Sequence, residues 1–197
     1  ATHLTASMLA GAHPTVKYSQ SSVMTVAYGI GDEGRVALGS LDLLDQPGTL
    51  EVLPITAQAV EGMSQTERAV RRTLPHATFD LVVMNPPFTR DTGHEGAKIG
   101  VPNPMFAAFG LTADQQRAMA RVTERLLKGS SAHGNAGEAS AFLVLADRKL
   151  KLWGTLALVM PLSLMSGEAW EKSRQLLHQS YGGLIVVSIA GARHDAF

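Results

Sequence analysis

The chain has 197 residues, of which 45% are hydrophobic and 17% are charged, and its 17 Lys and Arg residues balance its 17 Asp and Glu residues. A chain of this size and composition forms one globular domain or slightly more, and its neutral balance excludes an overall positive field for nucleic acid while allowing a local basic face. The absence of cysteine excludes disulfides, thiolate nucleophiles and cysteine-based zinc sites, and no apolar run reaches the roughly 18–20 residues of a membrane span, so we expect a cytoplasmic protein.

The first elements that the pattern predicts are mostly strands. Ser22–Tyr28 and Arg35–Leu44 are strand-like, and the glycines of GIGDEG between them permit a tight turn. Residues 55–75 predict a helix that Pro75 terminates. The next strand is expected at Phe79–Met84, whose sequence FDLVVM is almost entirely apolar.

The second half of the chain alternates helices with short apolar strands. A helix is expected to begin at Thr112, because Thr112 and Gln115 form a capping box, and to end at Gly129. The elements expected after it are a helix that ends near Trp153–Gly154, a strand at Thr155–Met160, a helix from Ser166 to about Gln179 and a strand at Leu184–Ile189. Buried strands that alternate with amphipathic helices predict an α/β fold with a parallel, doubly wound sheet.

The start of the sequence indicates a fragment of a longer protein. Ala1, Leu4 and Met8 fall on one helical face, and Gly11 followed by Pro14 is typical of a helix end. The sequence has neither an initiator Met nor the layout of a signal peptide at this point. We therefore expect the chain to begin inside an element.

The strand Phe79–Met84 is followed directly by Asn85, Pro86, Pro87 and Phe88. Two prolines fix two φ angles and restrict the residues before them, so the strand ends in a stiff segment. Open α/β sheets bind ligands at the carboxyl ends of their strands. This NPPF sequence after a buried strand resembles the catalytic motif of the S-adenosylmethionine-dependent N6-adenine DNA methyltransferases. A match by chance in a chain of this length is expected on the order of 1% of the time.

The resemblance assigns catalytic roles to Asn85, Pro86, Pro87 and Phe88. The exocyclic amine of adenine is a poor nucleophile, because its lone pair is delocalised into the ring. The side-chain oxygen of Asn85 and the carbonyl of Pro86 would accept hydrogen bonds from both N–H groups and direct the lone pair at the methyl donor, while the prolines hold the carbonyl in place. Phe88 would stack on the adenine after it is flipped out of the duplex. The plain alternative is a proline-rich strand end with a buried Phe88.

The resemblance also suggests one contact to the cofactor. In the family, an acidic or polar residue after an earlier strand contacts the adenine of S-adenosylmethionine, and Asp42 stands at that place. An ordinary turn aspartate that caps the next segment is equally consistent with the sequence. The Gly-rich cofactor loop and the ribose carboxylate of the family are absent from these residues. We therefore expect S-adenosyl-L-methionine to be bound by the full-length protein and not by this fragment.

The resemblance extends over most of the chain, although only NPPF is specific. The segment 138–177 resembles the helix, turn, strand and P-x-S segment that follow the motif in many adenine methyltransferases, which would place Met160, Pro161 and Ser163 near the site; ordinary loop and core roles are the alternative. The implied fold is α/β, a Rossmann-like methyltransferase sheet that is doubly wound and incomplete at both ends. Residues 1–197 would be a partial catalytic domain without the first two strands and without a target-recognition domain.

The absent strands of this fold belong between the strand before Asp42 and the strand before Asn85. Their absence would leave edges with unpaired backbone groups, which recruit other strands. We therefore expect the strand near Val36–Leu38 to pair in an unusual way, or another chain or copy to cover the edge.

Other residues carry weaker signals. The seven His residues show no metal-ligand spacing, and surface positions are expected for His94 and His133. Arg68, Arg71 and Arg72 are expected on a solvated helix face, with a phosphate contact as the alternative. No metal site is predicted.

Three functions remain open on the sequence. The first is a DNA adenine-N6 methyltransferase of a restriction-modification or phage-defence system, whose partner is DNA; the long segment 89–137 favours it. The second keeps the chemistry but methylates guanine N2 in RNA or a glutamine in a protein. The third is a non-catalytic module that binds nucleic acid.

Overall fold

The computed structural model describes residues 25–31, 34–45, 48–53, 70–87 and 112–188. These residues form seven strands in three small sheets, so the chain is a mixed helix-and-strand protein. The strands are β1 Thr25–Val26, β2 Tyr28–Ile30, β3 Val36–Leu38, β4 Thr49–Leu53, β5 Val70–Thr73, β6 Phe79–Met84 and β7 Leu150–Leu158.

The described residues also form three α-helices and four short 3-10 helices. The α-helices are α4 Ala113–Leu127, α5 Glu138–Lys149 and α6 Glu171–Ser180. The 3-10 helices are η1 Gly39–Leu44, η3 Gly134–Ala136, η4 Leu162–Leu164 and η5 Glu168–Trp170. No helix of the described residues is long and apolar enough to cross a membrane.

The amino-terminal strands pair in antiparallel fashion. β2 and β3 form a hairpin, and the turn predicted at GIGDEG is confirmed by hydrogen bonds from Gly31 N to the Arg35 carbonyl and from Gly34 N to the Gly31 carbonyl, both 2.9 Å. β1, β4 and β5 form a three-stranded sheet, with Leu50 opposite Arg72. The short turn between β2 and β3 requires them to be antiparallel, because parallel strands need a crossover of a dozen residues or more.

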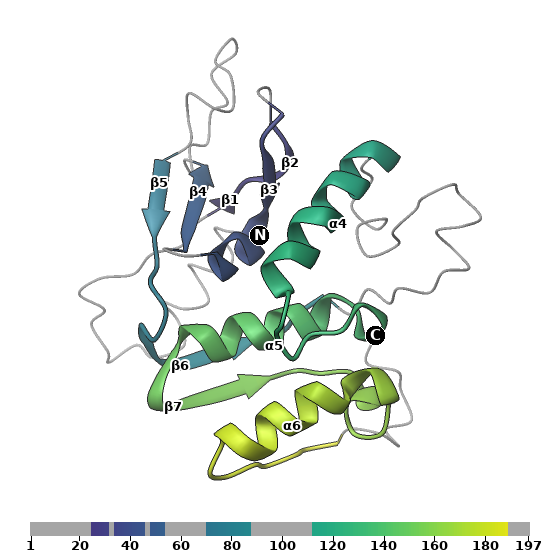
Figure 1. Cartoon of the computed structure of the whole chain (residues 1–197). Helices are drawn as coiled ribbons and strands as arrows, with labels where there is room; N and C mark the ends of the chain where they lie inside the picture. The colour runs from purple at the N-terminus through teal and green to yellow at the C-terminus, as the bar shows by residue number, and fades with distance from the viewer. Residues whose placement is uncertain (1–24, 32–33, 46–47, 54–69, 88–111, 189–197) are drawn as a thin grey trace.

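The carboxyl-terminal half contains a parallel β6–α5–β7 unit. Leu81 to Met84 of β6 lie opposite Thr155 to Leu158 of β7, and α5 runs directly into β7 at Leu150. Figure 1 shows α5 beside this pair of strands, with α6 at the outer side of β7. The strand predicted at Phe79–Met84 is confirmed, and this unit is the part of the expected parallel arrangement that the described residues contain.

The hydrophobic core lies where α4, α5, η1 and β4 meet. Its buried residues are Leu38, Leu41, Leu43, Leu44, Leu50, Met119, Ala120, Ala141, Val144 and Leu145. Both antiparallel and parallel parts therefore share one core, since α5 packs on η1 and also on β6 and β7.

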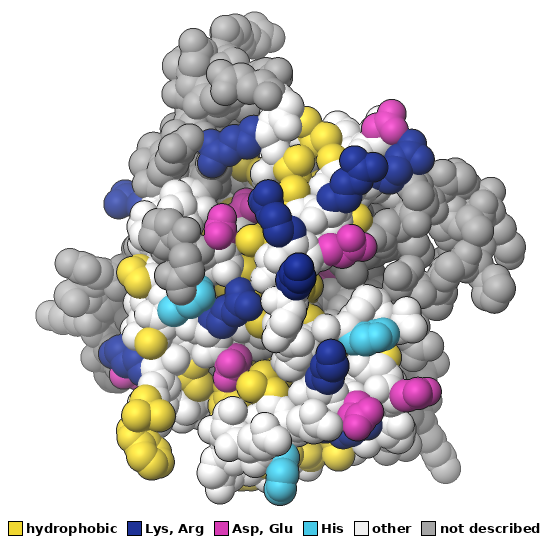
Figure 2. Space-filling view, viewed as in Figure 1, with side chains coloured by type: hydrophobic (Ala, Val, Ile, Leu, Met, Phe, Trp, Pro, Cys, Tyr) yellow, Lys and Arg dark blue, Asp and Glu magenta, His cyan; other side chains and the backbone are white. Residues whose placement is uncertain are grey.

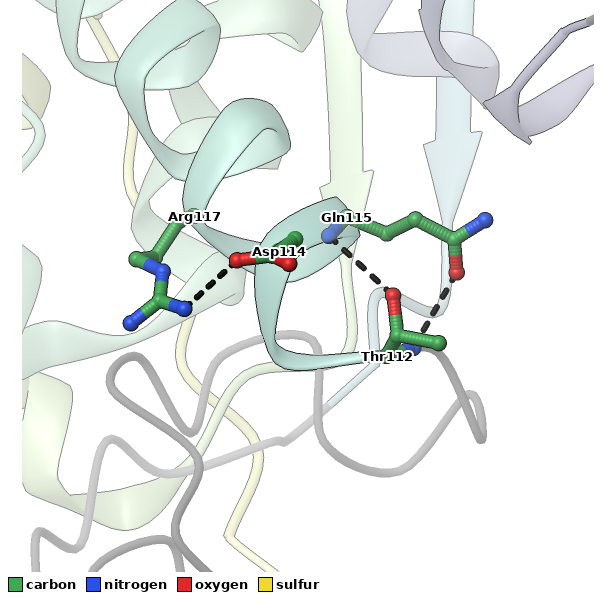
Figure 3. A network of polar contacts seen from close by, with 4 residues as sticks. All are labelled: Thr112, Asp114, Gln115 and Arg117. Carbon is green, nitrogen blue, oxygen red and sulfur yellow. Dashed lines mark hydrogen bonds and ion pairs between the residues drawn. The ribbon is translucent and has the colours of Figure 1, made fainter.

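Helix α4 begins and ends as the sequence predicts. Thr112 accepts a hydrogen bond from Gln115 N at 3.3 Å, and the Gln115 side chain accepts one from Thr112 N at 3.0 Å, which is the expected capping box (Figure 3). Gly129 follows the helix with φ +77°, a left-handed conformation that glycine adopts without strain. The reciprocal cap pairs two of the donors that a helix start leaves open.

Several predicted elements are wrong, and each error has a local cause. β3 ends at Leu38, and residues 39–44 form a 3-10 helix instead of continuing the strand. Residues 70–73, expected in a helix, form β5, because a proline stop signal is the same after a strand as after a helix. Of the predicted parallel sheet, the described residues contain the β6–β7 pair, while β3 pairs antiparallel with β2. This pairing is an ordinary hairpin with the preceding strand, so the unusual partner or second chain expected for Val36–Leu38 stays a prediction.

The elements around β7 also differ from the prediction. α5 ends at Lys149, and Leu150 to Gly154 belong to β7 through a bulge in which Trp153 has φ +68°. Apolar residues 142, 145, 146 and 150 are spaced as on one face of a helix, so the sequence pattern does not show that the helix ends at Lys149 and the strand begins at Leu150. Helix α6 begins at Glu171 after η5, not at Ser166. Leu184 to Ser188 are exposed and form no strand, because no partner strand lies beside them among the described residues.

Candidate functional site

Asn85 and the two prolines follow β6 at its carboxyl end. Asn85 is exposed, Pro86 is buried and Pro87 is partly buried. The strand beneath them is anchored, because Val82 is buried and Met84 packs against the core cluster. A stiff segment on an anchored strand keeps its backbone in one position. Phe88 lies outside the described residues, so its stacking role stays a prediction.

The ladder between the two parallel strands continues past the end of β7. Val159 N donates a hydrogen bond to the Met84 carbonyl at 3.0 Å. The residues that follow β6 and β7 therefore leave the sheet side by side, at the same edge. Met160 and Pro161, which the resemblance places near the site, are the next residues of β7's extension.

The loop after β7 is fixed by α6 and η5. The indole Nε1 of Trp170 donates to the Ser163 hydroxyl at 3.1 Å. Arg174 Nη1 donates to the carbonyls of Leu164 at 3.0 Å and Gly167 at 2.7 Å. Ser163 is thus a structural residue of this loop, which corresponds to the alternative weighed for it from the sequence.

The first turn of α5 lies at the same end of the unit as Asn85. Leu150, directly after α5, pairs with Phe79 at the start of β6. α5 has 12 residues and is about 18 Å long, and β6 has 6 residues and is about 20 Å long. Glu138 at the start of α5 is therefore level with the carboxyl end of β6.

A hollow of about 200 Å³ lies between the second half of α4 and the start of α5. Its lining residues are Ala120, Thr123, Glu124, Leu127, Ala132, His133, Gly134, Gly137 and Ser140. Ser140 is buried and donates to the carbonyls of Gly137, at 2.9 Å, and His133, at 3.2 Å. These bonds shape the segment before α5, so the hollow is a fixed feature of this side of the molecule.

Asp42 lies in η1 and not directly at a strand end. Its carboxylate accepts a hydrogen bond from Leu38 N at 3.0 Å, which ties the end of β3 to the first turn of η1. This is the turn-capping role that the sequence left open.

Three ionisable groups of the described residues, Lys149, His76 and Tyr28, have shifted pKa values with clear physical causes. Burial lowers the pKa of Lys149, and the neighbouring Arg148 lowers it further. Burial, Lys149 and Arg148 together lower the pKa of His76. Burial raises the pKa of Tyr28, with a further contribution from the Glu138 carboxylate. Lys149 and His76 lie at the amino end of β6, where the antiparallel sheet of β1, β4 and β5 meets the β6–α5–β7 unit. We call this contact the joint between the two halves of the fold.

The remaining candidates are placed as follows. Arg71 and Arg72 lie on β5 and not on a helix, with Arg72 exposed. His133 is exposed, as expected, while Arg68 and His94 lie outside the described residues. No group of three or more His, Asp or Glu side chains among the described residues is arranged to hold a metal ion.

The Asn85 segment offers two hydrogen-bond acceptors on a stiff support. Neither the Asn85 side chain nor the Pro86 carbonyl has a hydrogen-bond partner in the described part of the chain. An amide oxygen and a neighbouring carbonyl can together bind the two N–H groups of a planar amine.

Comparison with known proteins gives no relative: no family model, no curated protein and no solved structure matches this chain. The chemistry of the Asn85 segment is therefore argued from its own residues.

Proposed function

We propose that this chain carries the catalytic motif of a DNA adenine-N6 methyltransferase, which transfers a methyl group from S-adenosylmethionine to the exocyclic amine of a flipped adenine. One observation supports the proposal most: the NPP sequence follows the carboxyl end of β6, next to a parallel strand, with the Asn85 side chain exposed. Site residues of parallel α/β sheets lie at this edge. A restriction-modification or phage-defence setting and a Rossmann-like sheet belong to the same proposal.

The roles of the chain's own residues follow from their chemistry. The Asn85 amide oxygen and the Pro86 carbonyl accept hydrogen bonds from the amine, which favours a pyramidal nitrogen with an available lone pair. The methyl group itself is supplied by S-adenosylmethionine when it is bound. The acceptors need no rearrangement during the reaction, because the prolines already fix the backbone, and such preorganisation lowers the barrier.

Methyl transfer by the full-length protein tests this function. The protein is incubated with S-adenosylmethionine labelled in its methyl group, together with duplex DNA, structured RNA or a glutamine-containing protein in separate reactions. We expect label in DNA, and N6-methyladenine after digestion to nucleosides. Label in RNA or protein alone would move the chain to the second function. No transfer to any substrate would support a non-catalytic module.

Phe88 provides a second test of the proposal. Stacking requires an aromatic ring, and base–aromatic stacking contributes about 1–3 kcal/mol per base. Phe88→Tyr is expected to stay active, whereas Phe88→Ala should weaken binding of DNA that contains the target adenine. The measurement is the KM for such DNA in the methylation assay. A harmless Phe88→Ala together with a damaging Phe88→Tyr would indicate a buried core residue instead.

A further inference from the structure

Helix α4 has a basic outer face. The α4 basic face, as we call it, consists of four cations: Arg117, Arg121 and Arg125 of the helix and Lys128 directly after it. They follow one another at intervals of four, four and three residues, so they lie along one side of the helix. All four are exposed. Figure 2 shows dark-blue Lys and Arg side chains over the region that α4 occupies in Figure 1.

The cations outnumber the carboxylates on this face. Asp114 pairs with Arg117 at 2.6 Å (Figure 3), and Glu124 is the other acidic residue of the helix. Arg121, Arg125 and Lys128 form no ion pair or hydrogen bond with any other described side chain. Because Lys and Arg equal Asp and Glu over the whole chain, this excess is local and not a result of a generally basic composition.

The opposite face of α4 holds the helix in place. Met119 is fully buried, and Ala120 and Thr123 are buried beside it. The capping box fixes the first turn. The cations are therefore presented from a rigid element, which limits the entropy lost when they bind an anion to that of their own side chains.

The α4 basic face leads toward the Asn85 end of the molecule. Thr123, Glu124 and Leu127 of α4 line the hollow whose other wall is the segment before α5. The first turn of α5 is level with the carboxyl end of β6. A polyanion on α4 would therefore continue toward the edge of the sheet where Asn85 lies.

We infer that the α4 basic face binds the phosphate backbone of the duplex DNA whose adenine reaches Asn85. The inference rests on the proposed function for its choice of DNA. From Arg117 to Lys128 the helix rises about 16 Å. One strand of duplex DNA carries a phosphate every 3.4 Å or so along its axis, so about five phosphates lie along this length. Arginine and lysine on a surface helix bind such phosphates without reading the base sequence.

A salt titration of DNA binding by the 197-residue chain tests the inference. The affinity for a fluorescent duplex is measured by anisotropy between 50 and 200 mM salt, for wild type and for the double variant Arg121→Gln, Arg125→Gln. Glutamine keeps helix propensity and removes charge. Each phosphate contact contributes a slope of about 0.9 in a plot of log affinity against log salt, so two lost contacts reduce the slope by about 1.8. Over this salt range wild type should lose about 12-fold more affinity than the variant.

The matched control removes two exposed charges elsewhere. Arg72 on β5 and Lys172 on α6 are both exposed, and their replacement by Gln changes the net charge by the same amount. We expect the control to keep the wild-type slope, with circular dichroism showing all variants folded. Equal slopes for the two double variants, or no binding of DNA at 50 mM salt, would overturn the inference.

Two further outcomes separate this inference from the proposed function. Stronger binding of an RNA duplex with the same dependence on Arg121 and Arg125 would assign the face to RNA and overturn the choice of DNA. DNA methylation by the full-length protein with unchanged affinity in the double variant would keep the function and reject the α4 basic face. DNA binding that depends on this face without any methyl transfer would keep the face and reject the function.

Discussion

If the proposed function holds, replacement of Asn85 by Ala is expected to lower the turnover number of DNA methylation about 100-fold or more, because one of the two preorganised acceptors for the target amine is lost. The affinity for S-adenosylmethionine should stay close to that of wild type, since Asn85 is assigned to the amine and not to the cofactor. The measurement is kcat for DNA methylation, with cofactor binding determined by calorimetry.

A matched control is available in the same chain. Asn135 is exposed in η3, where its backbone N donates to His133 Nδ1 at 3.2 Å. Asn135→Ala removes the same amide group without touching the β6 end, and it should leave kcat unchanged. The assignment fails if Asn85→Ala methylates DNA at a rate similar to that of Asn135→Ala. Asn85→Asp keeps an acceptor oxygen and is expected to retain more activity than Asn85→Ala.

The best-predicted elements have strong local signals. The strand Phe79–Met84 and helix α4 lie where the sequence predicts them, the first from an apolar run before two prolines and the second from a reciprocal cap and a closing glycine. In both cases the signal lies within a few residues of the element itself. The Asn85 segment could be placed at a strand end for the same reason.

The features that were missed depend on long-range contacts. β5 exists because β4 supplies hydrogen bonds to it, and nothing within residues 70–73 distinguishes a strand from a helix end. The apolar run Leu184–Val187 resembles a buried strand, yet its side chains are exposed, with Ile185 90% accessible. A strand requires a partner, which a local pattern does not reveal. The basic spacing on α4, by contrast, is a local pattern that the sequence itself contains.

The joint between the two halves of the fold was also invisible in the sequence. Lys149 at the end of α5 is only 2% exposed, and its ammonium donates to the carbonyl of Leu74, which follows β5. Leu74 N in turn donates to the Gly48 carbonyl at 2.8 Å, just before β4. These contacts connect residues that are far apart in the chain, and they attach the antiparallel sheet to the helix that supports β6.

Gly48 is the position at which this joint should be most sensitive. Its φ is +74°, and a Cβ atom built there would lie 2.5 Å from Lys149 Nζ and 2.6 Å from the Leu74 carbonyl oxygen. The lysine end can move, but the Leu74 carbonyl belongs to the backbone and accepts the buried ammonium. Gly48→Ala must therefore shift backbone as well as strain its own φ.

Gly129→Ala separates the clash from the effect of φ. Gly129 has φ +77°, and a Cβ there would meet no atom within 4 Å. It should lower the free energy of unfolding by about 1–2 kcal/mol, the cost of a left-handed conformation for an L-residue. Gly48→Ala should lower it by that amount and a further 1–3 kcal/mol or so for overpacking. Urea unfolding of both variants measures the difference. An equal decrease in the free energy of unfolding for both variants would mean that the backbone around Gly48 accommodates the Cβ atom without strain. In that case Lys149 and Leu74 do not hold the two halves of the fold together.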